Sequence, residues 1–195
     1  MSVRAHRVAW LAAPAVGLAP VLGALGTKTS IRAQGIAPKG EWRYIGGDAW
    51  HRRYLPLDQI DSSNFGTLEV AWVWRGDNFG PAVDYVFRST PIYVDGILYT
   101  VAGQRRTVAA IDPGTGETLW AYREPNTTRY ERGMRNNYGK GVAYGEVNGR
   151  GVIYYTSPAF FLHALDAKTG EHIENWGGPV PIRGFPRSGV IDMLP

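Results

Sequence analysis

The sequence predicts an all-β protein built from repeated four-stranded units, and three observations carry this prediction. Glycine and proline are frequent, with 25 and 13 residues among 195, and they separate short apolar segments. After residue 26 no uninterrupted amphipathic helical pattern appears. A segment with Asp, Thr, Gly and Trp in the same order occurs twice, which indicates an internal repeat.

The repeated segment occupies residues 110–120 and residues 164–176. In each copy an apolar run ends at Asp, two turn residues and Thr-Gly follow, and a second run ends in Trp, after two extra residues in the second copy. Pro113 presets φ and Gly116 suits a left-handed position, so each copy predicts a β-hairpin. Asp112 and Asp166 lie 54 residues apart, near the ~40–50-residue period of propeller blades. We therefore predict a partial β-propeller whose closing tryptophans dock against neighbouring units.

The other elements follow from apolar periodicity and turn residues. Before the first repeat we expect an irregular packed lead-in segment, a short helical turn and a strand, at residues 41–60, 64–68 and 68–74. The first unit then has four strands, at residues 90–94, 97–102, 107–111 and 118–122, with a hairpin turn at Asp95-Gly96. The second unit repeats this order, with strands at residues 142–147, 152–156 and 161–165 before the second repeat and a turn at Asn148-Gly149.

The first 33 residues have the features of an export signal. Arg4 and Arg7 precede nineteen uncharged residues, 8–26, which end in small residues. Processing after Gly26 or after Ala33 fits equally well, and we assign residues 1–33 to the signal and residues 34–195 to the mature chain. An uncleaved membrane anchor is the alternative, although the prolines and glycines within the run make it a poor one. The sequence therefore predicts a periplasmic or secreted protein.

Composition and charge exclude several classes of function. The sequence has no cysteine, and therefore no disulfide, thiolate metal site or lipid-modified cysteine. Its net charge of +4 equals the four basic residues of the predicted signal, so the mature chain is neutral and gives no electrostatic reason to expect a nucleic acid partner. Between the two units, residues 123–141 form a basic stretch with a net charge of +3. Loops of this length are usually functional or disordered.

With these elements in place, the chain resembles the quinoprotein dehydrogenases, periplasmic enzymes that bind pyrroloquinoline quinone (PQQ) on the axis of an eight-bladed β-propeller. The similarity covers roughly residues 41–178. Besides the two repeats, it is carried by Trp42, Gly46, Asp48, Arg53, Tyr54, residues 56–60, Asn64, Leu68, Ala71, Trp72, residues 89–91 and residues 141–144. The repeats alone fit any PQQ-type propeller, including non-enzymatic ones. The lead-in segment and residues 141–144 are more specific to the dehydrogenases.

The resemblance implies three cofactor contacts. Thr156 is similar to a family threonine that hydrogen-bonds PQQ, and an ordinary strand threonine is the alternative. Lys140 stands where many members have an arginine, and its charge can still neutralise a PQQ carboxylate without the bidentate fork. Arg88 replaces a family glutamate or glutamine, and a solvated strand-end arginine is the alternative. Met134 and Arg135 occupy the place where alcohol-oxidising members carry adjacent cysteines.

The resemblance also implies the function. We expect the N-terminal part of an exported PQQ-dependent dehydrogenase that oxidises a sugar or an alcohol and passes electrons to a quinone or a cytochrome c. The catalytic aspartate and the Ca²⁺ ligands of the family are expected beyond this chain, which we therefore interpret as an incomplete and inactive propeller. The alternative is a non-catalytic PQQ-like propeller that serves as an envelope scaffold or assembly factor. His51, His163 and His172 show no metal-ligand spacing, and His163 is expected to be a packed or surface residue.

Overall fold

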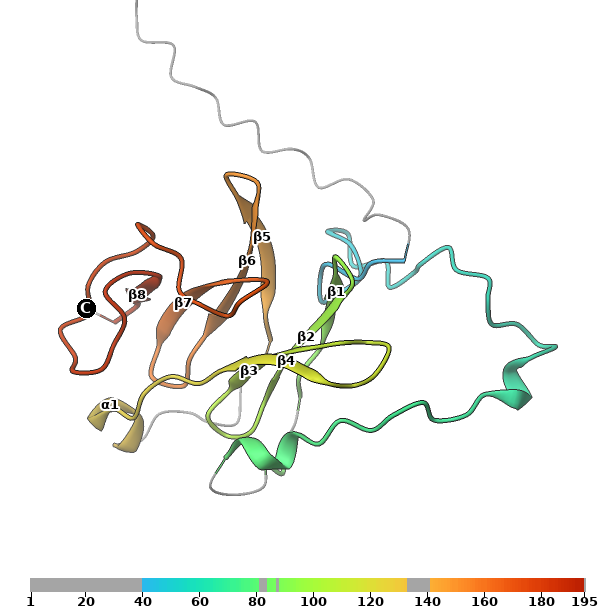
Figure 1. Cartoon of the computed structure of the whole chain (residues 1–195), viewed down its shortest axis with the longest axis horizontal. Coiled ribbons are helices and arrows are strands. Elements are labelled where there is room, and N and C mark those ends of the chain that lie inside the picture. The colour runs from blue at the N-terminus through green and yellow to red at the C-terminus, as the bar shows by residue number, and fades with distance from the viewer. Residues whose placement is uncertain (1–39, 81–83, 87, 133–140, 195) are drawn as a thin grey trace, which may run out of the picture. The chain divides into compact units, whose positions relative to one another are not determined.

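The computed structural model describes residues 40–80, 84–86, 88–132 and 141–194. These residues form two antiparallel sheets of four strands each (Figure 1). The first sheet has the order β1-β2-β3-β4, with strands Ile92–Val94, Ile97–Ala102, Thr107–Ile111 and Thr118–Tyr122. The second has the order β5-β6-β7-β8, with strands Ala143–Val147, Arg150–Thr156, Phe161–Asp166 and Val190–Asp192. The prediction of an all-β partial propeller made of four-stranded units is confirmed.

Helical structure in the described residues is short. It consists of the 3-10 helices η1 (Phe65–Thr67) and η2 (Gly76–Phe79) and the single turn α1 (Thr128–Glu131). Helix α1 begins after Thr127, whose hydroxyl accepts a hydrogen bond of 3.0 Å from the backbone N–H of Tyr130. Within the described part of the chain, no helix combines the length and the apolar character needed to cross a bilayer.

The two predicted two-residue hairpin turns are present. Asp95 and Gly96, with φ of 49° and 79°, connect β1 to β2, and Asn148 and Gly149, with φ of 52° and 75°, connect β5 to β6. Positive φ at both central residues defines a type I′ turn, whose twist matches that of the flanking strands. Aspartate, asparagine and glycine tolerate this left-handed backbone better than other residues do.

The two repeats form the same turn, which is organised by the aspartate. The Oδ1 atom of Asp112 accepts hydrogen bonds from the backbone N–H groups of residues 114 and 115, at 2.7 and 3.1 Å. The Oδ1 atom of Asp166 accepts the equivalent pair from residues 168 and 169, both at 2.8 Å. Gly116 and Gly170 then leave the turn with φ of 75° and 74°. The sequence repeat is therefore a repeat of hydrogen bonding, with the aspartate holding the turn closed.

Each of these turns receives a tryptophan from the preceding part of the chain. The indole N–H of Trp72 donates to the carbonyl oxygen of Pro113 at 2.9 Å, and that of Trp120 donates to the carbonyl oxygen of Ala167 at 3.0 Å. Each indole lies against the glycine of its turn, because an added Cβ would come within 2.7 Å of Trp72 at Gly116 and within 2.6 Å of Trp120 at Gly170. The predicted docking role of Trp120 is confirmed.

The core is shared by the two sheets. The buried side chains that form one hydrophobic cluster are Ile92, Val94, Tyr99, Val101, Val108 and Ala110 from the first sheet, and Val142, Ile153, Tyr155, Leu165 and Ala167 from the second sheet and its flanking residues. Because the side chains of a strand alternate between its faces, each sheet contributes every second residue to this layer. The two sheets pack as neighbouring blades.

The strand expected at residues 68–74 does not form. This segment belongs to no sheet, and Val70 and Val73 are 80% and 77% exposed. A strand needs a neighbour to pair its backbone N–H and C=O groups, and no described segment pairs with it. Its two tryptophans still contact the first sheet and its repeat turn. Trp72 donates to the carbonyl oxygen of Pro113, and the indole N–H of Trp74 donates a hydrogen bond of 2.9 Å to the hydroxyl of Thr118.

The second repeat differs from its predicted form after the turn. No full strand ends at Trp176, because residue 172 makes only an isolated bridge to Leu165, and the fourth strand is β8, at Val190–Asp192. Trp176 packs on Tyr154 of its own sheet, with 5.5 Å between the ring centroids. The two extra residues before Trp176 break the correspondence with the first copy. The edge of β7 is therefore shared between the bridge at Leu165 and the ladder with β8.

The lead-in segment is packed only at its beginning. Trp42 and Tyr93 exchange two backbone hydrogen bonds of 2.9 Å, and residues 46–48 are buried. From residue 49 the chain is largely exposed, with Trp50 and Tyr54 at 79% and 71%. The expectation of a tightly packed segment is wrong beyond Asp48, since the described residues provide no surface that covers these side chains.

The stacking of Trp120 on Gly170 yields a stability prediction. Gly170→Ala adds left-handed strain of about 1–2 kcal/mol and overpacking of about 1–3 kcal/mol, because the new Cβ overlaps the indole ring. Gly149→Ala is the matched control, because its φ of 75° is nearly the same and no atom lies within 4 Å of the added Cβ. Chemical denaturation of the protein should show a clearly larger loss of unfolding free energy for Gly170→Ala. Equal losses would contradict the docking role of the indole.

Candidate functional site

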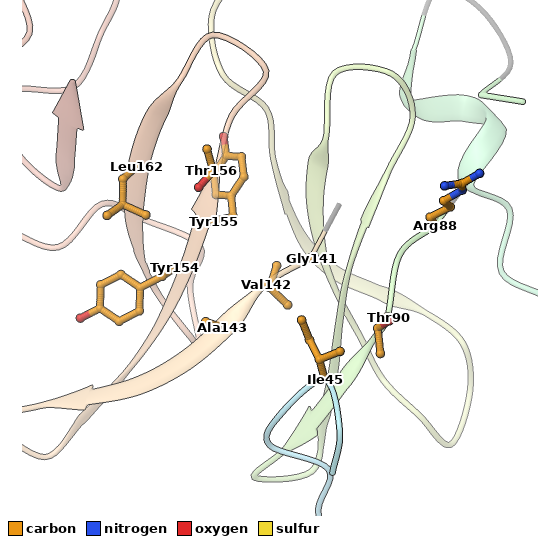
Figure 2. Close-up of a pocket in the computed structure, with 10 residues that line it drawn as sticks. All are labelled: Ile45, Arg88, Thr90, Gly141, Val142, Ala143, Tyr154, Tyr155, Thr156 and Leu162. Carbon is orange, nitrogen blue, oxygen red and sulfur yellow. The ribbon is translucent and has the colours of Figure 1, made fainter. Parts of the chain in front are cut away.

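A cavity of about 490 Å³ lies where the two sheets begin. Its lining comes from the residues that lead into β1 and β5, from the end of β6, from β7 and from the lead-in segment. Figure 2 shows these side chains, among them Ile45, Arg88, Thr90, Gly141, Thr156 and Leu162. Its volume falls within the range of about 300–1,000 Å³ that is usual for small-molecule sites. We take this cavity as the candidate functional site.

Backbone pairing brings the two sheets together at the cavity. Thr90 and Gly141 form an isolated parallel bridge, which joins the residues leading into β1 and β5. Ser89 is fixed by a side-chain hydrogen bond of 2.9 Å to Thr100 of β2. Among the described residues, the added Cβ of a residue at position 141 would meet the side chain of Ile45 alone, at 3.9 Å. Gly141 thus leaves the space beside the bridge open to a ligand.

The lining combines apolar walls with a few polar groups. Ile45, Val142 and Leu162 supply apolar surface, Thr90 and Thr156 supply hydroxyls, and Arg88 supplies a positive charge. None of the described residues that line the cavity carries a carboxylate. This composition suits a small ligand with apolar surface and hydrogen-bond acceptors.

Of the cofactor contacts predicted from the sequence, two lie at the cavity and one lies outside the described residues. Thr156 and Arg88 both line the cavity, but the Arg88 side chain points away from Thr156 and Val142 (Figure 2). Lys140 lies outside the described residues, as do Met134 and Arg135, although Gly141, directly after Lys140, is part of the lining. The contacts proposed for these residues stay predictions.

One residue beside Thr156 was missed at the sequence level. Arg106, from the turn between β2 and β3, is only 6% exposed, and its Nη1 donates a 2.8 Å hydrogen bond to the backbone carbonyl oxygen of Thr156. Its φ of 52° lies in the left-handed region, which is uncommon for non-glycine residues. Burial lowers the pKa of Arg106, and the negative charge of Glu124 opposes that effect. No motif in the sequence distinguishes Arg106 from a surface arginine.

A row of hydrogen-bonded polar side chains lies on the face of β7 opposite to the cavity residue Leu162. The Nε2 atom of His163 is 2.9 Å from Oε2 of Glu124, and its Nδ1 atom is 3.0 Å from Nε2 of His172. With both rings neutral, His163 donates to the Glu124 carboxylate and accepts from His172. Glu124 and His163 are 3% and 0% exposed on their side chains, so of the two states expected for His163, packed or surface, the structure shows the packed one.

The sequence did not predict this chain of contacts. Glu124 belongs to the long basic stretch at residues 123–141, and the spacing of His163 and His172 matches no metal-ligand motif. The antiparallel return of the chain after Gly170 brings His172 beside Leu165, and only that pairing places the two imidazoles together. In the described part of the chain, no three His, Asp or Glu side chains are arranged to hold a metal ion.

Comparison with known proteins agrees with this fold and identifies the family. The profile of the family described as "Glucose/ethanol/alcohol dehydrogenase, beta-propeller domain", a PQQ family, matches residues 42–192. The chain belongs to this quinoprotein dehydrogenase family. The dehydrogenase subunit of the quinone-dependent alcohol dehydrogenase of Komagataeibacter europaeus is 34% identical over 161 residues, which cover 80% of this chain and 20% of the relative.

Solved structures of the family show the same architecture. The quinohemoprotein alcohol dehydrogenase of Pseudomonas putida HK5 aligns with a TM-score of 0.58 and 30% identity, over 80% of this chain and 19% of that chain. The enzyme of the same class from Comamonas testosteroni aligns with a TM-score of 0.55 and 32% identity, over 71% of this chain and 19% of that chain. The chain thus spans about a fifth of the length of these relatives.

The cavity fits part of a PQQ site. PQQ is a flat quinone with three carboxylates, so it needs apolar walls for its ring plane and donors or positive charge for its oxygens. The cavity has both, with Val142 and Leu162 as walls and the hydroxyls of Thr90 and Thr156 as donors. The open space beside Gly141 allows a ring system to approach the backbone. The lining residues are therefore compatible with one side of the cofactor.

The half-buried imidazole of His172 gives the protein a predictable pH dependence. Burial, followed by the proximity of His163, lowers the pKa of His172 from 6.5 to about 4. Between these two values the unfolded chain binds a proton that the folded chain does not, so stability falls as the pH falls from 6.5 towards 4. Because the imidazole is only half-buried and solvent screens part of the effect, this residue should cost about 1 kcal/mol, and at most about 2 kcal/mol, of unfolding free energy at pH 5.

Denaturation curves at pH 7 and pH 5 for the protein and for His172→Gln would measure this effect. The variant can still donate to His163 but has no titrating group. We expect it to lose markedly less stability than the unaltered protein on acidification. The same loss in both proteins would show that His172 is not the residue responsible.

Proposed function

We propose that this chain forms the first two blades of a PQQ-dependent alcohol dehydrogenase and supplies one side of its cofactor site. The observation that carries the proposal is the cavity that Thr156, Arg88 and Gly141 line from two blades. Family membership gives the cofactor class, and the lining gives the residues that would contact it.

When bound, PQQ supplies a quinone that takes up the electrons and hydrogen removed from the alcohol. The residues of this chain bind and orient it. The Thr156 hydroxyl donates a hydrogen bond to a cofactor oxygen, and Lys140 neutralises a cofactor carboxylate as a point charge. Ile45, Val142 and Leu162 exclude water from that side of the ring and so strengthen both polar contacts.

The remaining catalytic groups are proposed to come from other blades of the intact protein. The family resemblance assigns the proton-accepting aspartate and the Ca²⁺ ligands to such blades. On this proposal residues 34–195 by themselves hold the cofactor on one side only and have no dehydrogenase activity. The whole enzyme is proposed to pass electrons to a quinone or to cytochrome c, as the names of its relatives say of those proteins.

The proposed substrate is an alcohol. The relatives compared above are named as alcohol dehydrogenases, whereas the family description also includes glucose. A sugar substrate rests on the family description alone, and the relatives favour the alcohol. The adjacent cysteines that the resemblance associates with alcohol oxidation are replaced by Met134 and Arg135, so the reaction is proposed to proceed without that disulfide.

The cofactor assignment predicts the effect of removing single contacts in the intact protein. Lys140→Ala should weaken PQQ binding by roughly 1–3 kcal/mol, the worth of a charge-assisted hydrogen bond. Lys168→Ala is the matched control, since Lys168 is exposed and does not line the cavity. Titration of the apo-protein with PQQ measures both. An unchanged affinity for Lys140→Ala would remove this lysine from the site.

The same preparation tests the activity. With PQQ, Ca²⁺ and a short-chain alcohol, the intact protein should reduce an artificial electron acceptor, and omission of PQQ should abolish that reduction. PQQ-independent reduction, or none with any alcohol or sugar, would favour a non-catalytic propeller.

We further propose that residues 1–33 export the protein, because the basic start and the uncharged run fit a cleaved signal. Fractionation of an export-competent bacterial host should recover a shortened chain from the periplasm or medium. Recovery of the uncleaved chain from the membrane would support the anchor instead, and recovery from the cytoplasm would contradict export.

A further inference from the structure

Arg106 connects the two blades directly behind the cavity. It lies in the turn between β2 and β3 of the first sheet, and its Nη1 donates to the carbonyl oxygen of Thr156 in the second sheet, at 2.8 Å. Thr156 is the last residue of β6 and lines the cavity. The bond therefore reaches across from one blade to the residue proposed to hold the cofactor in the next.

The conformation of Arg106 is costly in two ways. A guanidinium that is only 6% exposed has lost most of its hydration, and a φ of 52° is strained for a residue with a Cβ. A surface turn needs neither feature. Such strain persists only where the surrounding structure holds it in place, and it is concentrated at functional sites.

The contact adds a second hydrogen bond to the peptide group that follows Thr156. Thr156 pairs with Leu162 at the end of the β6–β7 ladder, and the backbone N–H of Ser157 donates to the carbonyl oxygen of Phe161 at 2.8 Å. Arg106 holds the other end of the same peptide group, the Thr156 carbonyl oxygen. A hydrogen bond to the Thr156 carbonyl orients the peptide group between residues 156 and 157. The direction of the Thr156 side chain depends on that orientation, because the Cα atom of Thr156 carries both the side chain and the carbonyl group.

We propose that Arg106 is a positioning residue that holds the Thr156 hydroxyl in the direction required to bind PQQ. This inference rests on the proposed function of the cavity and adds a residue that does not itself line it. A buried cation can affect cofactor binding in two other ways. Its charge attracts an anionic cofactor from a distance, and its bulk, together with Glu124 and Tyr155 nearby, supports the packing between the blades.

A double-mutant cycle separates these roles, because residues that act through one another are not additive. The substitutions are Arg106→Lys, which keeps the charge but lacks the planar fork of nitrogens, and Thr156→Val, which removes the hydroxyl at constant shape. PQQ affinity of the intact apo-protein is measured for both single variants and for the double variant. We expect Arg106→Lys to weaken binding about tenfold, and to weaken it less than twofold once Thr156 is valine.

Two more variants serve as controls for the charge of Arg106 and for the turn that carries it. Arg106→Gln removes the charge as well, and positioning predicts the same dependence on Thr156. Arg105→Gln, from the same turn, removes an arginine that donates to the Glu124 carbonyl oxygen and does not contact Thr156, and it should leave the affinity within twofold. Thermal unfolding identifies any variant that has lost its fold. If Arg106→Gln does not fold, the cycle with Arg106→Lys alone tests the positioning role.

The cycle and the binding of the unaltered protein test different claims. Equal weakening in the threonine and valine backgrounds would overturn the inference in favour of a charge or packing effect, as would normal binding by Arg106→Lys. If the unaltered protein binds PQQ, the proposed function stands whatever the cycle gives. Absence of PQQ binding by the unaltered protein would contradict the proposed function, and the inference would fall with it.

Discussion

The contact of an indole with a glycine in the next turn is the constraint on which the rest of the structure depends. Trp72 on Gly116 and Trp120 on Gly170 repeat one geometry, in which the indole N–H also donates to a turn carbonyl. The contact of the ring plane with the glycine backbone fixes the distance between the indole and the turn, and the hydrogen bond fixes the rotation of the indole. Each turn thus receives its tryptophan in one orientation, which sets how neighbouring units follow one another.

The candidate site is a consequence of that arrangement. Once the blades are fixed at the repeat turns, the residues leading into β1 and β5 meet at the bridge between Thr90 and Gly141, and the cavity forms beside it. Its polar groups come from segments far apart in the chain. A ligand in this position contacts both blades, so its binding adds to the packing between them.

The interior between the blades is not purely apolar. Arg106 bonds to Thr156, and Glu124 bonds to His163, which in turn contacts His172. These hydrogen bonds offset much of the hydration that the buried polar groups have lost. The hydroxyls of Tyr122 and Tyr155 have no protein partner among the described residues. Such a layer is sensitive to single substitutions, since removing one partner leaves another group buried and unpaired.

The sequence by itself determined the class of fold, seven of the eight strands and the family, because these depend on local patterns: alternating apolar residues, Asp-Gly and Asn-Gly turns, and the repeated Asp, Thr, Gly and Trp. It also pointed to Thr156 and Arg88 as residues of one site, through the resemblance. Only the tertiary structure decided that residues 68–74 stay unpaired, that β8 replaces a strand ending at Trp176, and that Arg106, Glu124 and His163 are buried. Pairing partners and burial depend on segments distant in sequence, and no local pattern encodes what lies on the other side of a strand.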